Sequence, residues 1–293
     1  MNRREFIATS IGAVAVGSAS AIVSSDQTQT TSTSRPTGSG PLKARLKQSV
    51  CRWCYGKIAL EDLCKAAAEI GLKSVELLGE KEWSMPAKFG ITCAVANGPT
   101  TISRGWNRVE NHDEFVRESE RLLPLIKAAG IPQMIVFSGN RDGQDDREGI
   151  KNCVKGLKRI TPLAEKLGVT VIMELLNSRV DHKDYQCDKT PWGVEVVQGV
   201  GSERFKLLYD IYHMQIMEGD VIRTIRDNFA HIAHYHTGGV PGRREIDQTQ
   251  ELFYPAICKA IVEAGFTGYL AQEFIPARDP LKSLAEAAAI CDV

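Results

Sequence analysis

Short apolar runs alternate with stretches of helical periodicity from Leu42 to the end of the chain. The apolar runs are bounded by glycine or polar residues, as is typical of buried parallel strands. Between these runs, apolar residues recur three and four positions apart, as on one face of a helix. The helical pattern at 60–70 is followed by Gly71, a residue that favours a helix end. The pattern predicts strands at 47–53, 74–78, 91–96, 133–138, 169–174, 205–210, 232–236 and 268–273, and helices at 60–70, 80–89, 113–129, 147–167, 190–200, 220–228, 250–264 and from Pro280 onward.

Eight strand–helix units in about 250 residues are the usual content of a (β/α)₈ TIM barrel. The sequence therefore predicts one α/β domain of this kind over 42–293. A doubly wound open sheet is the alternative, and it would normally carry a glycine-rich phosphate loop after its first strand. The segment Cys54-Tyr-Gly-Lys57 has no such pattern, which favours the barrel.

Four successive predicted strands, the fifth to the eighth, end on a polar side chain that can bind a metal. These residues are Glu174, Asp210, His236 and Glu273. One strand-end carboxylate would be read as exposed or paired with an arginine, but four at corresponding positions converge at one end of a barrel. Carboxylates with one imidazole suit Mg²⁺, Mn²⁺ or Co²⁺ better than a structural zinc. Without an ion the carboxylates should repel one another and raise at least one pKa.

Two further residues follow these strands closely enough to contact a substrate. His213 lies three positions after Asp210 and could donate to a substrate oxygen, or could cap the loop backbone. Arg243, in the glycine-rich loop 238–245, could bind a carboxylate or oxyanion, or could be solvated. Glu76, Arg104 and Glu245 are weaker candidates. His182 is predicted to be solvated, and His234 could belong to a lower layer of the barrel.

Composition adds little beyond an ordinary globular domain. The 36 basic and 36 acidic side chains give no net charge, so nothing suggests a surface for nucleic acid or anionic membranes. The eight cysteines mostly lie inside apolar patterns and are predicted to be buried thiols. Cys51 and Cys54 have Cys-x-x-Cys spacing but no second pair, so a metal or redox role is not expected. This composition is also compatible with a homo-oligomer.

The N-terminus has the pattern of an export signal. Asn2-Arg3-Arg4-Glu5-Phe6-Ile7 is a twin-arginine start, an apolar region follows, and small residues precede a cleavage point after Ala21. The alternatives are an uncleaved anchor or a chance arginine pair. Residues 24–41 contain no apolar side chain, so 22–41 is predicted to be a flexible linker after the signal 1–21. The expected location is outside the cytoplasm, with no stable membrane span after processing.

Several stretches of this chain resemble the hydroxypyruvate isomerase family of the xylose-isomerase-like barrel superfamily. They are Met173-Glu-Leu-Leu-Asn177, Tyr209-Asp-Ile-Tyr-His-Met-Gln215, Val240-Pro-Gly-Arg243 and Gln272-Glu273. The resemblance implies metal-dependent isomerisation of hydroxypyruvate through an enediolate, with Glu174 and Glu273 as metal ligands and as the acid/base pair. His236 stands where these isomerases usually have glutamine, and it is more similar to the ketose 3-epimerases. An epimerase, an exported sugar-binding protein without turnover and an endonuclease-like barrel are the alternatives.

Overall fold

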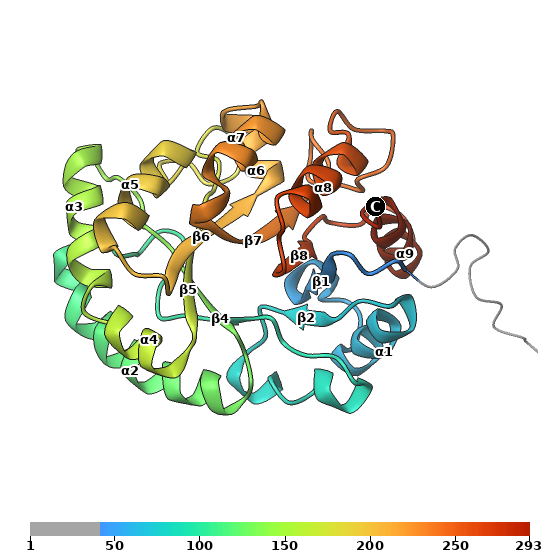
Figure 1. Ribbon diagram of the computed structural model, residues 1–293, viewed down its shortest axis with the longest axis horizontal. Helices are drawn as coiled ribbons and strands as arrows, with labels where there is room; N and C mark the ends of the chain where they lie inside the picture. The colour runs from blue at the N-terminus through green and yellow to red at the C-terminus, as the bar shows by residue number, and fades with distance from the viewer. Residues whose placement is uncertain (1–41) are drawn as a thin grey trace, which may run out of the picture. The chain divides into compact units, whose positions relative to one another are not determined.

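A computed structural model describes residues 42–293, which form one α/β barrel (Figure 1). Neighbouring strands are parallel, in the order β2-β1-β8-β7-β6-β5-β4-β3. Two isolated parallel bridges, Ser74–Thr92 and Leu78–Ala96, join β2 to β3 and complete the ring. The strands are β1 (Lys47–Cys51), β2 (Ser74–Glu76), β3 (Val95–Asn97), β4 (Gln133–Val136), β5 (Thr170–Glu174), β6 (Phe205–Asp210), β7 (Ile232–Thr237) and β8 (Tyr269–Gln272).

Helices surround the strands, which explains why the strands read as nearly continuous apolar runs. All five residues of β5 are buried, and alternate side chains pack inside the barrel and against the helices. Ile172 and Leu208 belong to the small interior cluster, whereas Met173 and Leu207 belong to the larger core beneath the helices. The helices are α1 (Leu60–Ile70), α2 (His112–Ala128), α3 (Asp146–Leu157), α4 (Thr161–Leu167), α5 (Thr190–Val200), α6 (Ile211–Met217), α7 (Val221–Asn228), α8 (Tyr254–Glu263) and α9 (Pro280–Ile290).

Proline explains where the predicted helices were too long. The single helix predicted for 147–167 is two helices, and α4 begins with Thr161 and Pro162. Proline restricts the residue before it and has no N–H for the preceding turn, so a new helix starts there. The helix predicted for 80–89 is a pair of 3₁₀ helices, Glu80–Glu82 and Pro86–Phe89, and α8 begins only at Tyr254, before Pro255.

Two further predictions were wrong in detail. The strand expected from Ile91 begins at Val95, because Thr92 makes only an isolated bridge. The residues after β6 form the short helix α6 rather than a loop. The carboxylate of Asp210 caps this helix, since its Oδ1 accepts from the backbone N–H of His213 at 3.1 Å.

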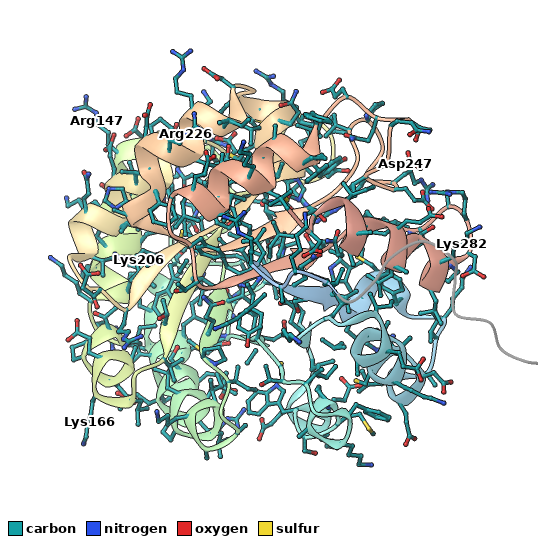
Figure 2. The ribbon with its side chains drawn as sticks, turned by 45° about the vertical axis from the view of Figure 1, so that its right-hand side comes forward. Arg147, Lys166, Lys206, Arg226, Asp247 and Lys282 are labelled. Carbon is teal, nitrogen blue, oxygen red and sulfur yellow. The ribbon has the colours of Figure 1, made fainter. Side chains whose placement is uncertain are left out.

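Charged side chains such as Arg147, Lys166 and Lys282 lie at the periphery of the barrel (Figure 2). The eight cysteines are free thiols, and seven of them are buried, as predicted. Within residues 42–293, none of the helices is both long and apolar enough to cross a membrane. The predicted export signal and linker lie outside the described residues.

Candidate metal centre and active site

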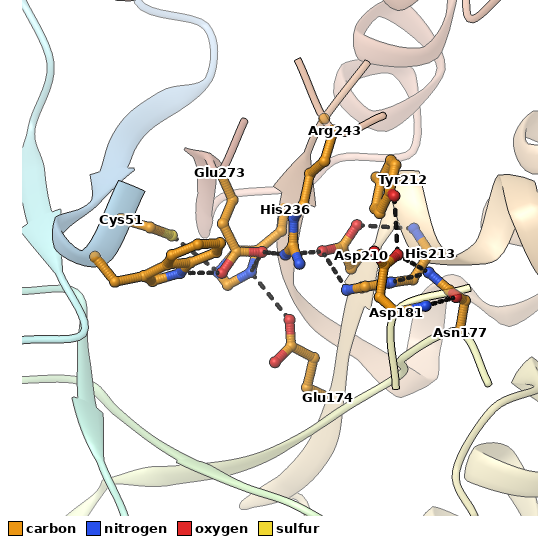
Figure 3. Close-up of polar contacts among 12 residues, drawn as sticks. Cys51, Glu174, Asn177, Asp181, Asp210, Tyr212, His213, His236, Arg243 and Glu273 are labelled. Carbon is orange, nitrogen blue, oxygen red and sulfur yellow. Dashed lines mark hydrogen bonds and ion pairs between the residues drawn. The ribbon is translucent and has the colours of Figure 1, made fainter. Parts of the chain in front are cut away.

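The four predicted ligands lie together at the carboxyl ends of β5, β6, β7 and β8 (Figure 3). One ligand atom from each of them falls within 4.8 Å of all the others, and none of the side chains is more than 6 % exposed. The register of the sheet explains part of this, because it pairs Asp210 directly with His236. Residues far apart in the chain thus form one buried cluster of three carboxylates and one imidazole.

His236 is held with Nδ1 toward the carboxylates. Nδ1 lies 3.2 Å from Glu174 Oε1 and 2.9 Å from Glu273 Oε2. On the other edge of the ring, Nε2 lies 3.1 Å from Glu76 Oε1. A carboxylate behind a ligating histidine is the usual way in which proteins fix the ring and its tautomer at a metal site. The donor set and this orientation fit a divalent cation bound through Nδ1.

Glu76 connects the centre to the barrel interior. The Oε1 atom of this fully buried residue also lies 2.9 Å from His234 Nε2, and His234 in turn contacts Gln133. Burial alone would raise the pKa of Glu76, but the two histidines outweigh it and lower the pKa to about 2. Glu76, a weaker candidate from the sequence, is therefore an ionised carboxylate directly behind His236, and His234 belongs to the layer below the four ligands.

Arg243 reaches into the cluster rather than into solvent. One of its guanidinium nitrogens lies 3.3 Å from Asp210 Oδ2 and also pairs with Glu273 Oε2. The guanidinium lies against the rings of Trp53 and Tyr212, at 5.0 and 5.3 Å from their centroids. Arg243 thus offers a buried cation beside the carboxylates.

His213 also lies in the site. Its Nδ1 is 2.6 Å from the Asn177 side-chain nitrogen, and its Nε2 is buried without a hydrogen-bond partner among residues 42–293, 3.6 Å from Asp210 Oδ2 (Figure 3). The ring therefore does not cap the backbone. The prediction that His182 is simply solvated is wrong, because it is only partly exposed and its ring packs on His213 at 5.2 Å.

Two weaker candidates lie outside the cluster. Arg104 forms an exposed ion pair with Glu114, at 2.6 Å. Glu245 is buried, but its carboxylate accepts from the backbone N–H groups of Ala277 and Arg278 and from the Ser283 hydroxyl. Glu245 therefore stabilises the loop after β8 and does not face the four ligands.

Two residues of the Cys-x-x-Cys segment contact the site, although sequence reasoning gave them no role. Trp53 Nε1 donates to Glu273 Oε1 at 2.8 Å, and Cys51 Sγ lies 3.7 Å from His236 Nε2. Cys51, Glu76 and His236 are close enough to form a second ligand group. Because burial raises the pKa of the Cys51 thiol and Glu76 already partners the imidazole, we interpret this group as a hydrogen-bonded support.

Burial and neighbouring charges give the three carboxylates different pKa values. Burial raises the pKa of Glu174, and repulsion from Glu273 adds to the rise. Burial also raises the pKa of Asp210, although Arg243 opposes it. For Glu273, attraction to His236 and Arg243 outweighs burial and lowers the pKa. The expected rise in at least one carboxylate pKa is thus found, but desolvation contributes more to it than mutual repulsion does.

A model of the family described as xylose isomerase-like TIM barrel matches residues 64–291. The chain belongs to this family. A human protein provisionally named hydroxypyruvate isomerase is 25 % identical over 239 residues, which cover 80 % of each chain. A 2-oxo-tetronate isomerase of Cupriavidus necator is 29 % identical over 234 residues, covering 76 % of this chain and 89 % of the relative.

Solved structures share the fold of this family member at low identity. A structure titled AP endonuclease, family 2, from Brucella melitensis has a TM-score of 0.76 at 22 % identity, covering 83 % of this chain and 99 % of that one. A D-psicose 3-epimerase of Clostridium cellulolyticum has a TM-score of 0.69 at 17 % identity, covering 84 % and 97 %. At these identities the likeness shows the fold alone.

Proposed function

We propose that this family member is a metal-dependent isomerase that moves a proton between adjacent carbons of a small hydroxy-carbonyl compound. The observation that carries the proposal is the buried cluster in which Glu174 and Glu273 face one centre with Asp210 and His236. The names of the human and Cupriavidus relatives support the same class of reaction. Hydroxypyruvate, converted to tartronate semialdehyde, is the first substrate to test.

The cluster would hold Mg²⁺, Mn²⁺ or Co²⁺ through Glu174, Asp210, His236 Nδ1 and Glu273. A bound ion of this kind supplies a Lewis acid that stabilises negative charge on neighbouring substrate oxygens. Glu76 would keep His236 oriented for that role. Ionised carboxylate oxygens are also the ligands that such hard divalent cations prefer.

In this proposal the two glutamates transfer the substrate proton from one carbon to the next. Glu273 is ionised and so able to accept a proton, since its pKa is lowered, and Trp53 Nε1 holds its Oε1 at 2.8 Å. A glutamate takes a proton from the carbon that bears the hydroxyl; the C–H electron pair becomes the C=C bond of an enediolate, and the carbonyl π pair moves onto its oxygen. Glu174 or Glu273 then returns a proton to the former carbonyl carbon, and the proton of the original hydroxyl passes to the other oxygen, so the hydroxyl carbon becomes the new carbonyl and the product is an isomer of the substrate. His213 and Arg243 would bind its oxygens.

A ketose 3-epimerase is the second candidate. It is supported by His236 in place of the glutamine usual in hydroxypyruvate isomerases, and by space beside the site. A cleft of about 620 Å³ between the loops after β3, β4 and β5 is lined by residues including Thr101, Asn140 and His182. The His182 ring, which lines this cleft, also packs on His213, so the cleft adjoins the site on that side.

Deuterium exchange tests the proposed reaction. Metal-loaded protein in D₂O should incorporate deuterium into hydroxypyruvate, 2-oxo-tetronate or a ketose at the carbon next to the carbonyl. Glu273→Gln should abolish exchange and turnover, whereas Glu245→Gln, the same change at a buried carboxylate outside the cluster, should keep both. Near-normal turnover in Glu273→Gln would reject the assignment of this base. A sugar-binding protein or an endonuclease would show no exchange with any of these compounds.

The predicted export signal is the basis of a separate proposal about the location of the protein. The twin-arginine pattern at Arg3 and Arg4 supports export of the folded, metal-loaded domain. Export would put the substrate outside the cytoplasm, whereas the metal would be loaded before export. Fractionation of cells that express the full chain, compared with a variant in which both arginines are lysine, tests it: the proposal predicts that only the unaltered chain leaves the cytoplasm.

A further inference from the structure

His213 has one satisfied and one unsatisfied ring nitrogen. Nδ1 lies 2.6 Å from the Asn177 side-chain nitrogen, and Nε2 is fully buried without a partner on the side of Asp210. A neutral imidazole carries its proton on one nitrogen only, so the tautomer decides whether the ring offers the site a donor or an acceptor. The contacts of Asn177 determine which it is.

The orientation of the Asn177 amide is fixed by its other partners. Its Oδ1 accepts from the backbone N–H groups of Val180 and Asp181 at 2.9 and 3.0 Å. Its Nδ2 donates to Asp181 Oδ2 at 2.6 Å, and the Tyr212 hydroxyl donates to the same oxygen at 2.8 Å. The reversed amide would place its NH₂ against two N–H groups and its oxygen against a carboxylate. The NH₂ group therefore faces His213 (Figure 3).

An amide donor at Nδ1 requires a lone pair on that nitrogen. The proton of the neutral ring then lies on Nε2. The other tautomer would bring two donors to 2.6 Å at one end of the ring, and would turn a lone pair toward the Asp210 carboxylate, 3.6 Å away, at the other. Both ends of the ring thus favour the same tautomer.

We propose that Asn177 is a positioning residue that holds neutral His213 as the Nε2–H tautomer, so that this N–H is a fixed donor to a substrate oxygen beside the metal ligands. The assignment of the donor to substrate rests on the proposed isomerase function. A preoriented N–H stabilises charge that develops on a substrate oxygen without giving up its proton. The ring therefore forms a hydrogen bond only, and proton transfer stays with the glutamates.

Asn177→Asp tests the proposal with a side chain of the same shape. It keeps the oxygen that caps the loop but replaces the NH₂ with an acceptor, which should move the His213 proton to Nδ1. Because the new oxygen also faces Asp181 Oδ2, Asp181→Asn is introduced with it to supply a donor there, and Asp181→Asn alone is measured beside it. The readout is the ¹⁵N–¹H spectrum of the imidazoles in the Mg²⁺-loaded full chain, with the His213 signals assigned by their loss in His213→Gln. Wild type should show the Nε2–H pattern and Asn177→Asp the Nδ1–H pattern. Turnover should fall roughly 10²-fold, the usual effect of losing one such donor, with little change in KM.

The matched control is Asn152→Asp, since Asn152 is also buried and donates its amide to a backbone carbonyl, at 3.1 Å. It should leave the His213 tautomer and the turnover unchanged. An Nδ1–H pattern in wild type, or an unchanged pattern in Asn177→Asp, would overturn the proposal. A tautomer switch with undiminished turnover would overturn its catalytic part. Failure of wild type to convert any tested substrate would reject the proposed function instead, and the spectra would still decide the tautomer.

Discussion

Glu76→Gln should weaken metal binding although Glu76 is not itself a ligand. Its Oε1 faces His236 Nε2 at 3.1 Å and His234 Nε2 at 2.9 Å, inside a fully buried layer of the barrel. Glutamine keeps the shape of this side chain but removes the charge. It also places an NH₂ group either against the two imidazoles or at the position of Oε2, which has no hydrogen-bond partner in the described part of the chain. In both orientations His236 loses the charged acceptor that holds Nδ1 toward the site.

The size of the effect follows from the role of Glu76. Loss of a carboxylate behind a ligating histidine typically costs 10- to 100-fold in metal affinity. That corresponds to about 1.4–2.7 kcal/mol of binding free energy. A larger loss would be expected only if the substitution also displaced His236, because then one of the four ligands would be removed altogether.

Calorimetric titration of Mn²⁺ into metal-free protein measures the change. Glu245→Gln is the matched control, since it alters a buried carboxylate whose partners are the loop after β8. The control should bind Mn²⁺ like wild type. If Glu76→Gln also bound Mn²⁺ with wild-type affinity while remaining folded, Glu76 would not orient the ligand, and binding through Nδ1 would lose its main support.

Three other predictions concern Glu273, the stability that the metal adds, and a buried histidine away from the site. Trp53→Phe removes the N–H that donates to Glu273 at 2.8 Å but keeps an aromatic ring beside Arg243. A hydrogen bond to a charged group contributes about 1.5–3 kcal/mol, so turnover should fall about 10-fold or more. The control is Trp83→Phe, which removes an N–H that donates to the Leu78 carbonyl and should leave turnover unchanged. Addition of metal at about 100 times its Kd should raise the free energy of unfolding by about 2.7 kcal/mol, and EDTA should reverse the gain in a denaturant titration. Burial lowers the pKa of His112 from its usual value of 6.5, so the unfolded state binds this proton more readily and stability should fall as the pH drops below 6.5. Between pH 7 and 5.5, His112→Gln should therefore lose less free energy of unfolding than wild type. An equal loss in the two proteins would contradict this cause.

The sequence was sufficient to predict the barrel and the four clustered residues, for one physical reason. Parallel strands in a barrel end at the same edge, so a polar residue that directly follows an apolar run is placed at the site by topology alone. Asp210 and His236 show this directly, because the register of β6 and β7 makes them neighbours.

Strand topology does not predict the contacts of side chains that are positioned by the shape of a loop. Arg243 has a backbone φ of 55°, and only the folded loop carries its side chain back to Asp210 and Glu273. The contact between Asn177 and His213 likewise depends on the turn that Asn177 caps. Trp53 follows the same rule as the four clustered residues, because it lies two residues after the end of β1, at the edge of the barrel where the site is.

The most direct test of the account is a crystal structure of the protein soaked in Mn²⁺, with the ion located by its anomalous scattering. The account predicts one ion at the carboxyl ends of β5 to β8, bound by Glu174, Asp210, Glu273 and the Nδ1 atom of His236. An ion elsewhere, binding through Nε2 of His236, or a cluster that stays metal-free at saturating Mn²⁺ would contradict the account.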